Sequence, residues 1–465
     1  HTTEAFYIAE GALKQILFDL RRDMSDSSDW FDGDINGLIV DGSPIPAPNP
    51  TTWTYACKNA AMGDGIFSVE LKEIVGNRAA MLVRTTGTSS GITQKLLTAV
   101  QMVNLNAWNN VIFSGTGQAG HAISGNVDIR GSVHILGTSL IATDLAMDLS
   151  GSGNIGNNYV GMPAILRSRV PNPPTVDFNG EMVESLGAEV RIKRGKLGLS
   201  GTALAGSVDV IGNTVKETLD SIYVTDGYGG NQGSLNVNSD NGIANGYDVG
   251  DAVTFQNFSN SYKDDDGTVY PTYSDYIAAK GMDLSTIAGW SGKIDDTTAS
   301  FTGTDVHGNS IAWNQATGIL NVSGVIYANG SVDIGKKSTT IMYDGIGTLV
   351  TLGANSDIII HGNIYSQGQF TTDDTMAFIA ERNVEVATGG GESQINVTGL
   401  FYAQNQITSA KQSQLVGVFN ANYFDMGSQV PSIYHVPSFD PANHPGLIAR
   451  NPIFFMKHSS WQEVQ

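Results

Sequence analysis

Residues 125–137 (GNVDIRGSVHILG) contain two consecutive copies of one pattern, a short run of alternating apolar and polar residues closed by glycine. The pattern returns at Gly206–Gly212 and at Gly330–Gly335. A strand this short cannot bury an apolar face alone. Strands stacked as parallel rungs bury a continuous core, and glycine supplies the special backbone angles at the corners. The repeats therefore predict a β-solenoid, with a sandwich of many short strands as the structural alternative.

A second pattern supports this prediction in the later part of the chain. It begins with glycine and carries tyrosine and an amide residue at fixed places, at Gly324–Asn329, Gly362–Gln367 and Gly399–Gln404. Between residues 213 and 316 the repeats are blurred, and segments rich in Gly, Asn, Asp and Tyr predict long loops that leave the rungs. Such loops are either a binding face or tolerated insertions.

The composition excludes several classes of protein. The 465 residues include 55 glycines, which disfavours a helical bundle because glycine and β-branched residues form helices poorly. The net charge of -20 repels nucleic acid and anionic lipid on average, so any contact with DNA needs a local basic patch. The single cysteine, Cys57, permits no internal disulfide, and the sequence contains no run of about 18 apolar residues.

The first 105 residues have a pattern different from the repeats. Apolar residues from Phe6 to Leu20 follow the helical period and predict an amphipathic helix. We expect this helix to continue upstream of His1, where a membrane anchor would lie. A polar loop is predicted at 23–50. Three antiparallel strands with short connectors are predicted at 65–74, 78–87 and 92–103. A helix against such a sheet forms an α+β unit.

This unit resembles a known family at several positions. The helix matches a stretch of the type IV pilin-like minor pilins of the PilX kind at Tyr7, Ala9, Glu10 and Gly11. Gly11-Ala12 departs from the family, which usually has Ala-Gly there. The sheet is also similar, with Arg78-Ala79 opening the middle strand and Thr85–Thr88 closing it. The resemblance implies a helix that contacts other pilins and whose upstream half holds the precursor in the inner membrane.

The C-terminal segment suggests how the two patterns are connected. After a proline-rich stretch from Val430, the chain ends in an apolar run and a Trp-x-Glu-Val sequence similar to that of related minor pilins. We expect this segment to return as a strand to the pilin-like sheet. The predicted organisation is a pilin-like domain at 1–105, completed by 446–465, with a β-solenoid inserted at 106–445. Such an architecture resembles competence-associated pilins and implies a role at the pilus tip in DNA uptake.

Catalytic and cofactor-binding motifs occur only in unsuitable contexts. Gly87–Gly91 fits G-x-S-x-G but joins two predicted strands, whereas a nucleophile elbow leads into a helix. Gly151–Gly156 fits G-x-G-x-x-G, but no helix follows. The aspartate pairs at 295–296 and 373–374 are the candidates for a glycan-cleaving site, and exposed turns explain them better. We expect no enzyme, cofactor or metal; Ca²⁺ in the Asp/Asn-rich loops, as near Asp264–Gly267, is the alternative.

A cluster of basic residues stands out against the acidic background. Six of the 25 lysines and arginines lie in one short span: Arg167, Arg169, Arg191, Lys193, Arg194 and Lys196. Arg167 and Arg191 are 24 residues apart, as are Arg169 and Lys193, so rungs of that length would stack them at roughly 4.8 Å. The cluster predicts a phosphate-binding stripe for double-stranded DNA, and nearby Tyr159 is a candidate for added stacking. The alternative is a structural cluster neutralised by nearby acids: Glu181, Glu184 and Glu189.

Three functions are compatible with these patterns. The first is a minor pilin of a type IV pilus or competence system, at the pilus tip on the cell surface, that binds extracellular DNA for uptake in natural transformation. The second is a pilus-tip adhesin that binds glycans or surfaces through the tyrosine-rich loop at 259–276. The third is a solenoid enzyme that acts on polysaccharide. Salt-dependent DNA binding separates the first from the second, and converging carboxylates in an open groove would favour the third.

Overall fold

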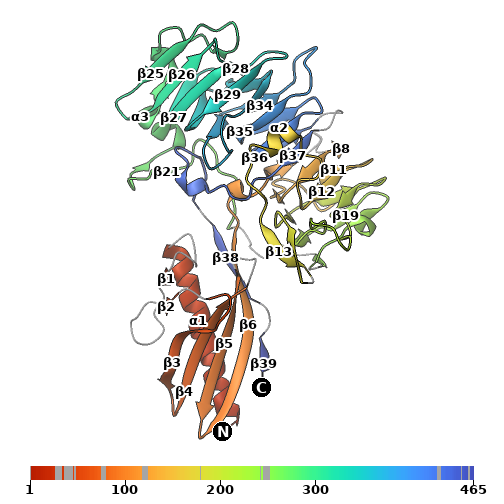
Figure 1. Cartoon of the computed structure of the whole chain (residues 1–465), viewed down its shortest axis with the longest axis vertical. Coiled ribbons are helices and arrows are strands. Elements are labelled where there is room, and N and C mark those ends of the chain that lie inside the picture. The colour runs from red at the N-terminus through yellow and green to blue at the C-terminus, as the bar shows by residue number, and fades with distance from the viewer. Residues whose placement is uncertain are drawn as a thin grey trace. The chain divides into compact units, whose positions relative to one another are not determined.

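The computed structural model shows two compact units. It describes residues 2–26, 34–35, 45–46, 49–74, 80–117, 124–178, 180–240, 242–244, 252–426, 431–451, 453–458 and 461–464. The first unit contains His1–Leu105, Thr175–Met182 and Pro452–Gln465, and the second contains Asn106–Pro174 and Val183–Asn451 (Figure 1). Most of the predicted loop at 23–50, and Arg78-Ala79 at the predicted strand start, lie outside the described residues.

The first unit packs one helix, α1 (Thr2–Asp26), against an antiparallel sheet of order β3–β4–β5–β6–β38, with β39 also paired to β6 (Figure 1). The strands are β3 (Thr54–Met62), β4 (Gly65–Glu73), β5 (Ala80–Ser89), β6 (Ile92–Asn104), β38 (Phe454–His458) and β39 (Gln462–Val464). The predicted helix and three antiparallel strands are confirmed. The sequence gives no alternation that would predict β3, and its pairing with β4 shifts register twice.

The core of the first unit lies between α1 and the sheet. Ile8, Leu13 and Ile16 of the helix are buried with Val83 of β5 and Met456 of β38. The periodicity of the helix places these apolar residues on one face, as expected for a helix that covers a sheet. Strand β38 runs antiparallel to β6, from Phe454 opposite Asn104 to His458 opposite Val100. The C-terminal chain is therefore part of this sheet.

Short strands form two further two-stranded sheets. They are the pair β1 (Asp34–Ile35) and β2 (Ile45–Pro46), and the pair β13 (Thr175–Phe178) and β14 (Glu181–Glu184). In the described part of the chain, no helix combines the length and the apolar character needed to cross a membrane.

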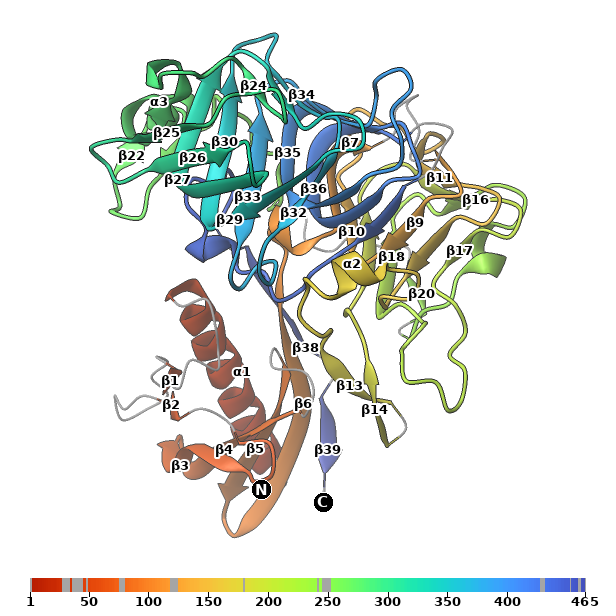
Figure 2. The ribbon, with the colours of Figure 1, turned by 45° about the horizontal axis from the view of Figure 1, so that its top comes forward.

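The second unit is a large region of parallel strands. Its main ladder runs in space from β23 through β36 to β7 and on to β20, and every neighbouring pair in it is parallel (Figure 2). The strands, in that order, are β23 (Met282–Asp283), β27 (Ile319–Asn329), β30 (Ile346–Leu352), β33 (Thr375–Ala380), β35 (Asn396–Ser409), β36 (Gln414–Asp425), β7 (Ile112–Gly117), β10 (Val133–Ile135), β15 (Glu189–Ile192), β18 (Ser221–Val224) and β20 (Ile243–Ala244).

Three further sets of parallel strands flank the main ladder. The second ladder contains β24 (Lys293–Ile294), β28 (Val332–Ile334), β31 (Asp357–Ile360) and β34 (Asn383–Val386). The third contains β29 (Thr340–Asp344), β32 (Asn363–Ser366), β37 (Ser432–Tyr434), β9 (Asp128–Arg130), β12 (Asn154–Gly156) and β17 (Leu204–Ala205). A separate sheet contains β8 (Ser124–Gly125), β11 (Leu145–Leu149), β16 (Lys196–Leu199) and β19 (Tyr228–Gly229).

The parallel stacking agrees with the mainly β class, but the rungs are not separate short strands as a solenoid prediction implies. Among the described residues, 23 strands join into one sheet that wraps around a common core. The joins occur because β27, β35 and β36 are 11, 14 and 12 residues long and each pairs with members of more than one ladder. We call one circuit of the chain through this sheet a coil.

The coils do not follow one another in sequence order along the stack. The chain begins the second unit at β7, in the middle, and builds outward to β20. It then resumes at the other end with β23 and returns to the middle, where β36 pairs with β7 through Phe419 and Ile112. The stack is therefore made of two halves that meet at one parallel pairing.

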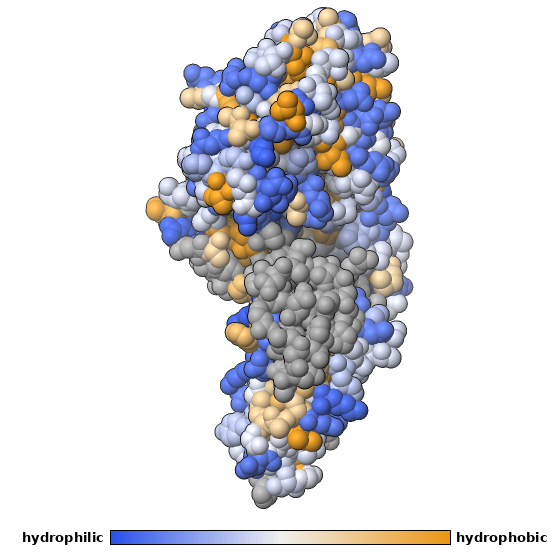
Figure 3. All heavy atoms as spheres, turned by 90° about the vertical axis from the view of Figure 1, so that its left-hand side faces the viewer, coloured by the Kyte–Doolittle hydropathy of each residue, from blue (hydrophilic) through white to orange (hydrophobic). Residues whose placement is uncertain are grey.

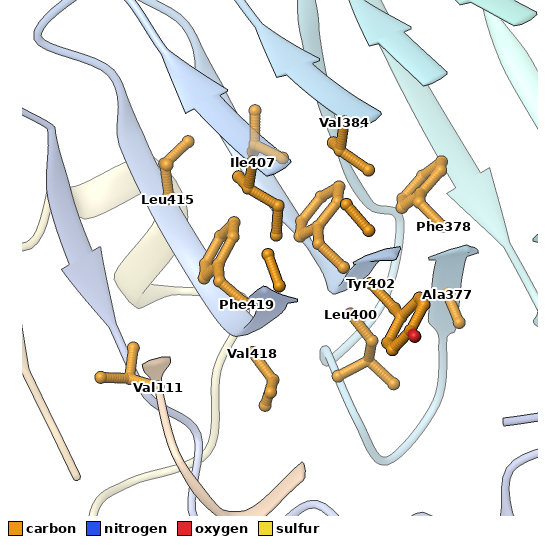
Figure 4. Close-up of a cluster of buried hydrophobic side chains, with 14 of the residues drawn as sticks. Val111, Ala377, Phe378, Val384, Leu400, Tyr402, Ile407, Leu415, Val418 and Phe419 are labelled. Carbon is orange, nitrogen blue, oxygen red and sulfur yellow. The ribbon is translucent and has the colours of Figure 1, made fainter. Parts of the chain in front are cut away.

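The core of the second unit is a continuous column of aliphatic and aromatic side chains. Phe378, Phe401 and Phe419 come from successive strands of the main ladder and stack face to face, with ring centroids 5.0 and 4.9 Å apart. Figure 4 shows Phe378 and Phe419 turned into the same interior as Val384 and Ile407. By contrast, hydrophilic residues predominate on the outer face of this unit seen in Figure 3.

The second unit contains further short elements. They are β21 (Tyr262–Lys263), β22 (Val269–Tyr270), β25 (Phe301–Thr304), β26 (Ser310–Asn314), the helices α2 (Ala164–Arg167) and α3 (Tyr273–Lys280), and the 3₁₀ turns at Ala107–Asn109, Gly233–Asn236, Leu284–Thr286 and Pro441–Asn443. Of these, β25 and β26 extend the large sheet from β27 by antiparallel pairing. Strands and a helix are thus present within 213–316, where the sequence indicated long loops.

One copy of the repeat is not a strand. Gly206–Gly212 lies in an irregular segment in which Val208, Val210 and Ile211 are 69%, 60% and 100% exposed. The strand prediction for this copy is wrong because alternation alone does not determine whether a neighbouring coil is available to cover the apolar side chains.

Candidate functional site

The predicted basic residues lie on different elements. Arg167 ends α2 and Arg169 follows it, whereas Arg191 is in β15 of the main ladder. The predicted stacking of Arg167 on Arg191, and of Arg169 on Lys193, is wrong: Arg191 lies between His134 of β10 and Tyr223 of β18. The coils have unequal lengths here, so a spacing of 24 residues does not correspond to one circuit.

Arg191 is buried and has its partners within the fold. Its guanidinium is buried, forms an ion pair with Glu189, and lies 5.9 Å from the ring centroid of Tyr223. Glu189 is one of the acids that the sequence suggested as neutralising partners. His134, which pairs with Arg191 across the two strands, is also buried. Burial lowers the pKa of its imidazole well below the usual value, and the positive charges of Arg191 and Lys193 lower it further. His134 is therefore neutral at physiological pH.

Arg167 and Arg169 form hydrogen bonds that tie the segment around α2 to its neighbours. Arg169 Nε donates to Ser366 O at 2.9 Å, its Nη1 donates to Ile165 O at 3.1 Å, and its guanidinium lies 4.4 Å from the ring centroid of Tyr365. Arg167 Nη2 donates to Asn172 Oδ1 at 2.7 Å. These contacts hold both guanidinium groups in fixed positions.

Tyr159 does not provide an exposed stacking surface. Its ring is buried, its hydroxyl donates to His435 O at 2.7 Å, and Arg167 lies 5.4 Å from its centroid. Burial raises the pKa of this hydroxyl well above the usual range. Tyr159 is therefore unavailable to stack on a base.

The remaining three predicted residues lie together. Lys193 and Arg194 follow β15 and line an open hollow of about 410 Å³ with Leu140 and Thr225, and Lys196 begins β16 directly after them. Arg194 is exposed, and Lys193 and Lys196 are half-buried. Asp226 also lines the hollow, but its carboxylate accepts from Gly195 N–H at 2.8 Å. We call this group the Lys193–Lys196 corner; it can present cations to a phosphate.

A second group of cations was not apparent from the sequence analysis. Lys293, Lys336 and Lys337 line a pocket of about 370 Å³ together with His361. A sequence signal for it does exist, because Lys336-Lys337 directly follows the repeat at Gly330–Gly335. The lysines come from neighbouring coils, and only the pairing of Lys293 with Asp333 brings them together.

Three of the four tyrosines in the segment at 259–276 are packed inside. Tyr262, Tyr273 and Tyr276 are buried against one another and against Phe258, and Tyr273 donates its hydroxyl to Gly446 O at 2.6 Å. Burial raises the pKa of Tyr276 to about 12. These three rings are unavailable to a glycan or surface, so only the half-buried Tyr270 remains of the four tyrosines on which the adhesin hypothesis depends.

The aspartate pairs are not all exposed turn residues. Asp374 is buried and accepts from Gly345 N–H at 2.8 Å, and Asp295 is buried and accepts from Thr297 N–H at 2.7 Å. Both carboxylates therefore serve neighbouring backbone, which corrects the prediction of exposed turns. In the described part of the chain, no three His, Cys, Asp or Glu side chains are grouped so as to hold a metal ion.

Each of the two sequence motifs with catalytic resemblance overlaps a strand and the turn beside it. Gly87–Gly91 connects β5 to β6 as an antiparallel hairpin. Gly151–Gly156 leads into β12, and the residues after it form bends and a turn.

The fold defined by these two units, a helix on an antiparallel sheet together with a large wrapped parallel region, is that of a solved pilin. A similar structure is that of the competence-associated pilin ComZ from Thermus thermophilus, with a TM-score of 0.60 and 18% sequence identity over 100% of this chain and 97% of that chain. At this identity the likeness establishes the fold. No family model matches the sequence, and no curated protein matches it.

Proposed function

We propose that this protein is a pilin-like subunit of a type IV pilus or competence system, and that its second unit binds double-stranded DNA for uptake in natural transformation. The observation that carries the proposal is the likeness to a competence-associated pilin over the whole of both units. Folds host many functions, so the DNA-binding part rests on the side chains of this chain.

The filament-facing surface is the exposed side of α1. Tyr7 and Phe18 are 62% and 61% exposed on the helix side that does not contact the sheet. Aromatic residues are enriched where proteins contact one another. We infer that this side contacts other pilins, that a segment upstream holds the precursor in the inner membrane, and that the assembled subunit lies at the pilus tip on the cell surface.

The DNA-contacting residues that we propose are those of the Lys193–Lys196 corner. The chain carries a net charge of -20, so duplex DNA is repelled except where cations are concentrated. Arg194 is exposed and suits bidentate contact with a phosphate, and Lys193 and Lys196 add positive charge beside it. Phosphate contacts of this type bind without sequence preference and weaken steeply with salt. We propose no catalytic role.

The test measures the binding of duplex DNA by the full chain, using fluorescence anisotropy at a series of salt concentrations. We expect the double variant Arg194→Gln/Lys196→Gln to bind more weakly and to lower the slope of log affinity against log salt by about 2. Lys263→Gln, which removes an exposed lysine elsewhere in the second unit, is the matched control. Unchanged affinity in the double variant excludes the corner, and no binding by the unaltered chain excludes DNA as the ligand.

A further inference from the structure

The pocket around His361 lies at one edge of the second ladder, where three neighbouring coils leave their strands. Ile294, Ile334 and Ile360 are adjacent in register and end β24, β28 and β31. The cations of the pocket adjoin these strand ends: Lys293, Lys336, Lys337 and His361. The pocket has a volume of about 370 Å³, which suits a small ligand.

The lysines of this pocket form at most weak, exposed ion pairs, so they can bind an anion. Lys293 Nζ lies 3.8 Å from Asp333 and Lys336 Nζ lies 3.6 Å from Asp296, and both lysine side chains are more than half exposed. Exposed pairs at such distances contribute little, so an incoming anion can replace the carboxylate. Lys337 is exposed and has no ion pair among the described residues.

Each acid of the pocket already has a hydrogen-bond partner. His361 Nδ1 lies 2.5 Å from a carboxylate oxygen of Glu392, and its Nε2 lies 3.3 Å from one of Asp333. Because both ring nitrogens face carboxylates, the doubly protonated imidazolium is favoured. The third acid, Asp295, accepts hydrogen bonds from Thr297 and Thr298. Three lysines and an imidazolium thus face three carboxylates that all have partners.

We propose that this pocket binds the anionic group of a small ligand, a phosphate or a carboxylate, through the ammonium groups of Lys293, Lys336 and Lys337. The role of His361 is to position Glu392 and Asp333 and to cancel one of their two negative charges. This site is distinct from the Lys193–Lys196 corner and does not depend on DNA binding. A phosphate ester and an acidic sugar share the required chemistry.

The experiment is calorimetric titration of the full chain with inorganic phosphate and, separately, with glucuronate. We expect at least one probe to bind, and the double variant Lys336→Gln/Lys337→Gln to weaken that binding roughly tenfold or more, equivalent to about 1.4 kcal/mol. Lys263→Gln should bind as the unaltered chain does. The probe that binds identifies the ligand as a phosphate or a carboxylate compound.

A pH series with the probe that binds separates anion binding from general salt effects. Partial burial alone would lower the pKa of His361, but the hydrogen bonds of Glu392 and Asp333 raise it above 6.5. As the pH rises through that raised pKa, His361 loses its charge, so the affinity of the unaltered chain should fall relative to that of His361→Gln measured at the same pH; this ratio cancels the titration of the probe itself. Absence of binding by both probes, or equal binding by the double variant and the unaltered chain, would overturn the proposal.

Discussion

At the scale of single residues, Gly87 shows how a motif that resembles a catalytic site serves packing. A Cβ atom at this position would lie 2.5 Å from Ala9 N and would also meet Ala5 O, so the helix backbone rests directly on the strand. Two residues earlier, the hydroxyl of Thr85 donates to Ala9 O at 2.9 Å. Both residues therefore fix the distance between α1 and β5.

Gly87→Ala should lower the free energy of unfolding of the first unit by about 1–3 kcal/mol, because a methyl group must push the helix away from the sheet. Denaturant unfolding followed by circular dichroism measures this change. Gly390→Ala is the control, since a Cβ there meets nothing within 4 Å. A loss of stability no larger than that of the control would show that the close approach is relieved at little cost.

His361 gives stability a pH dependence of known sign. Its pKa in the folded chain is raised above 6.5, so its contribution is fully present below pH 6.5 and is lost as the pH rises through the raised value. His361→Gln should therefore lower the thermal midpoint of the second unit at about pH 6 and have a smaller effect near pH 9. Equal effects at the two pH values would indicate that the ring matters through its shape and not its charge.

At the scale of elements, β38 belongs to the first unit although it follows the second in sequence. Met456 of this strand is buried in the core beneath α1. Met456→Ala should cost about 2–5 kcal/mol of stability in the first unit, because the deletion leaves a cavity. Glu463→Ala in β39, where the side chain is exposed, should leave the midpoint of denaturant unfolding unchanged. If Met456→Ala left the stability unchanged, β38 would not be a structural part of the first unit.

The stacked phenylalanines should dominate the local stability of the main ladder. Phe401 lies between Phe378 and Phe419, with both neighbours stacked on its faces. Phe401→Ala should cost about 3–5 kcal/mol in the second unit. Val208→Ala, at a side chain that is 69% exposed, is the control and should be close to neutral. Comparable losses in the two variants, measured by denaturant unfolding, would contradict the structural role of the stack.

Particular elements show what the sequence could and could not predict. The helix and the strands at 65–74 and 92–103 follow from periodicity because each buries one face. The parallel strands β28 and β32 follow from the repeated patterns, since glycine brackets both. Strand β3 lacks such a pattern, and the copy at Gly206–Gly212 has the pattern without a covering neighbour.

A candidate site could be predicted only where its residues are close together in the sequence. Lys193, Arg194 and Lys196 are close in sequence and remain close in space. A spacing of 24 residues would stack Arg167 on Arg191 only if the coils were equal in length. The loops between the strands differ in length, so the two residues do not stack. The pocket of Lys293, Lys336 and His361 required the strand register, which a single sequence does not provide.

At the scale of the whole molecule, the two units have separate cores. Two transitions are expected in calorimetric unfolding, because each core can be lost without the other. Met456→Ala should shift only the transition of the first unit, and Phe401→Ala only that of the second. A single transition shifted by both variants would show that the units unfold together.

The return of the chain to the first sheet has a consequence for biosynthesis. Leu105 N–H donates to Ile453 O at 2.8 Å, so residues far apart along the chain become neighbours only after everything between them has left the ribosome. Until then β6 presents an unpaired backbone edge, which can capture a strand from another polypeptide. A nascent copy of this protein should consequently need a chaperone, or rapid export, to keep that edge vacant for its own last strands.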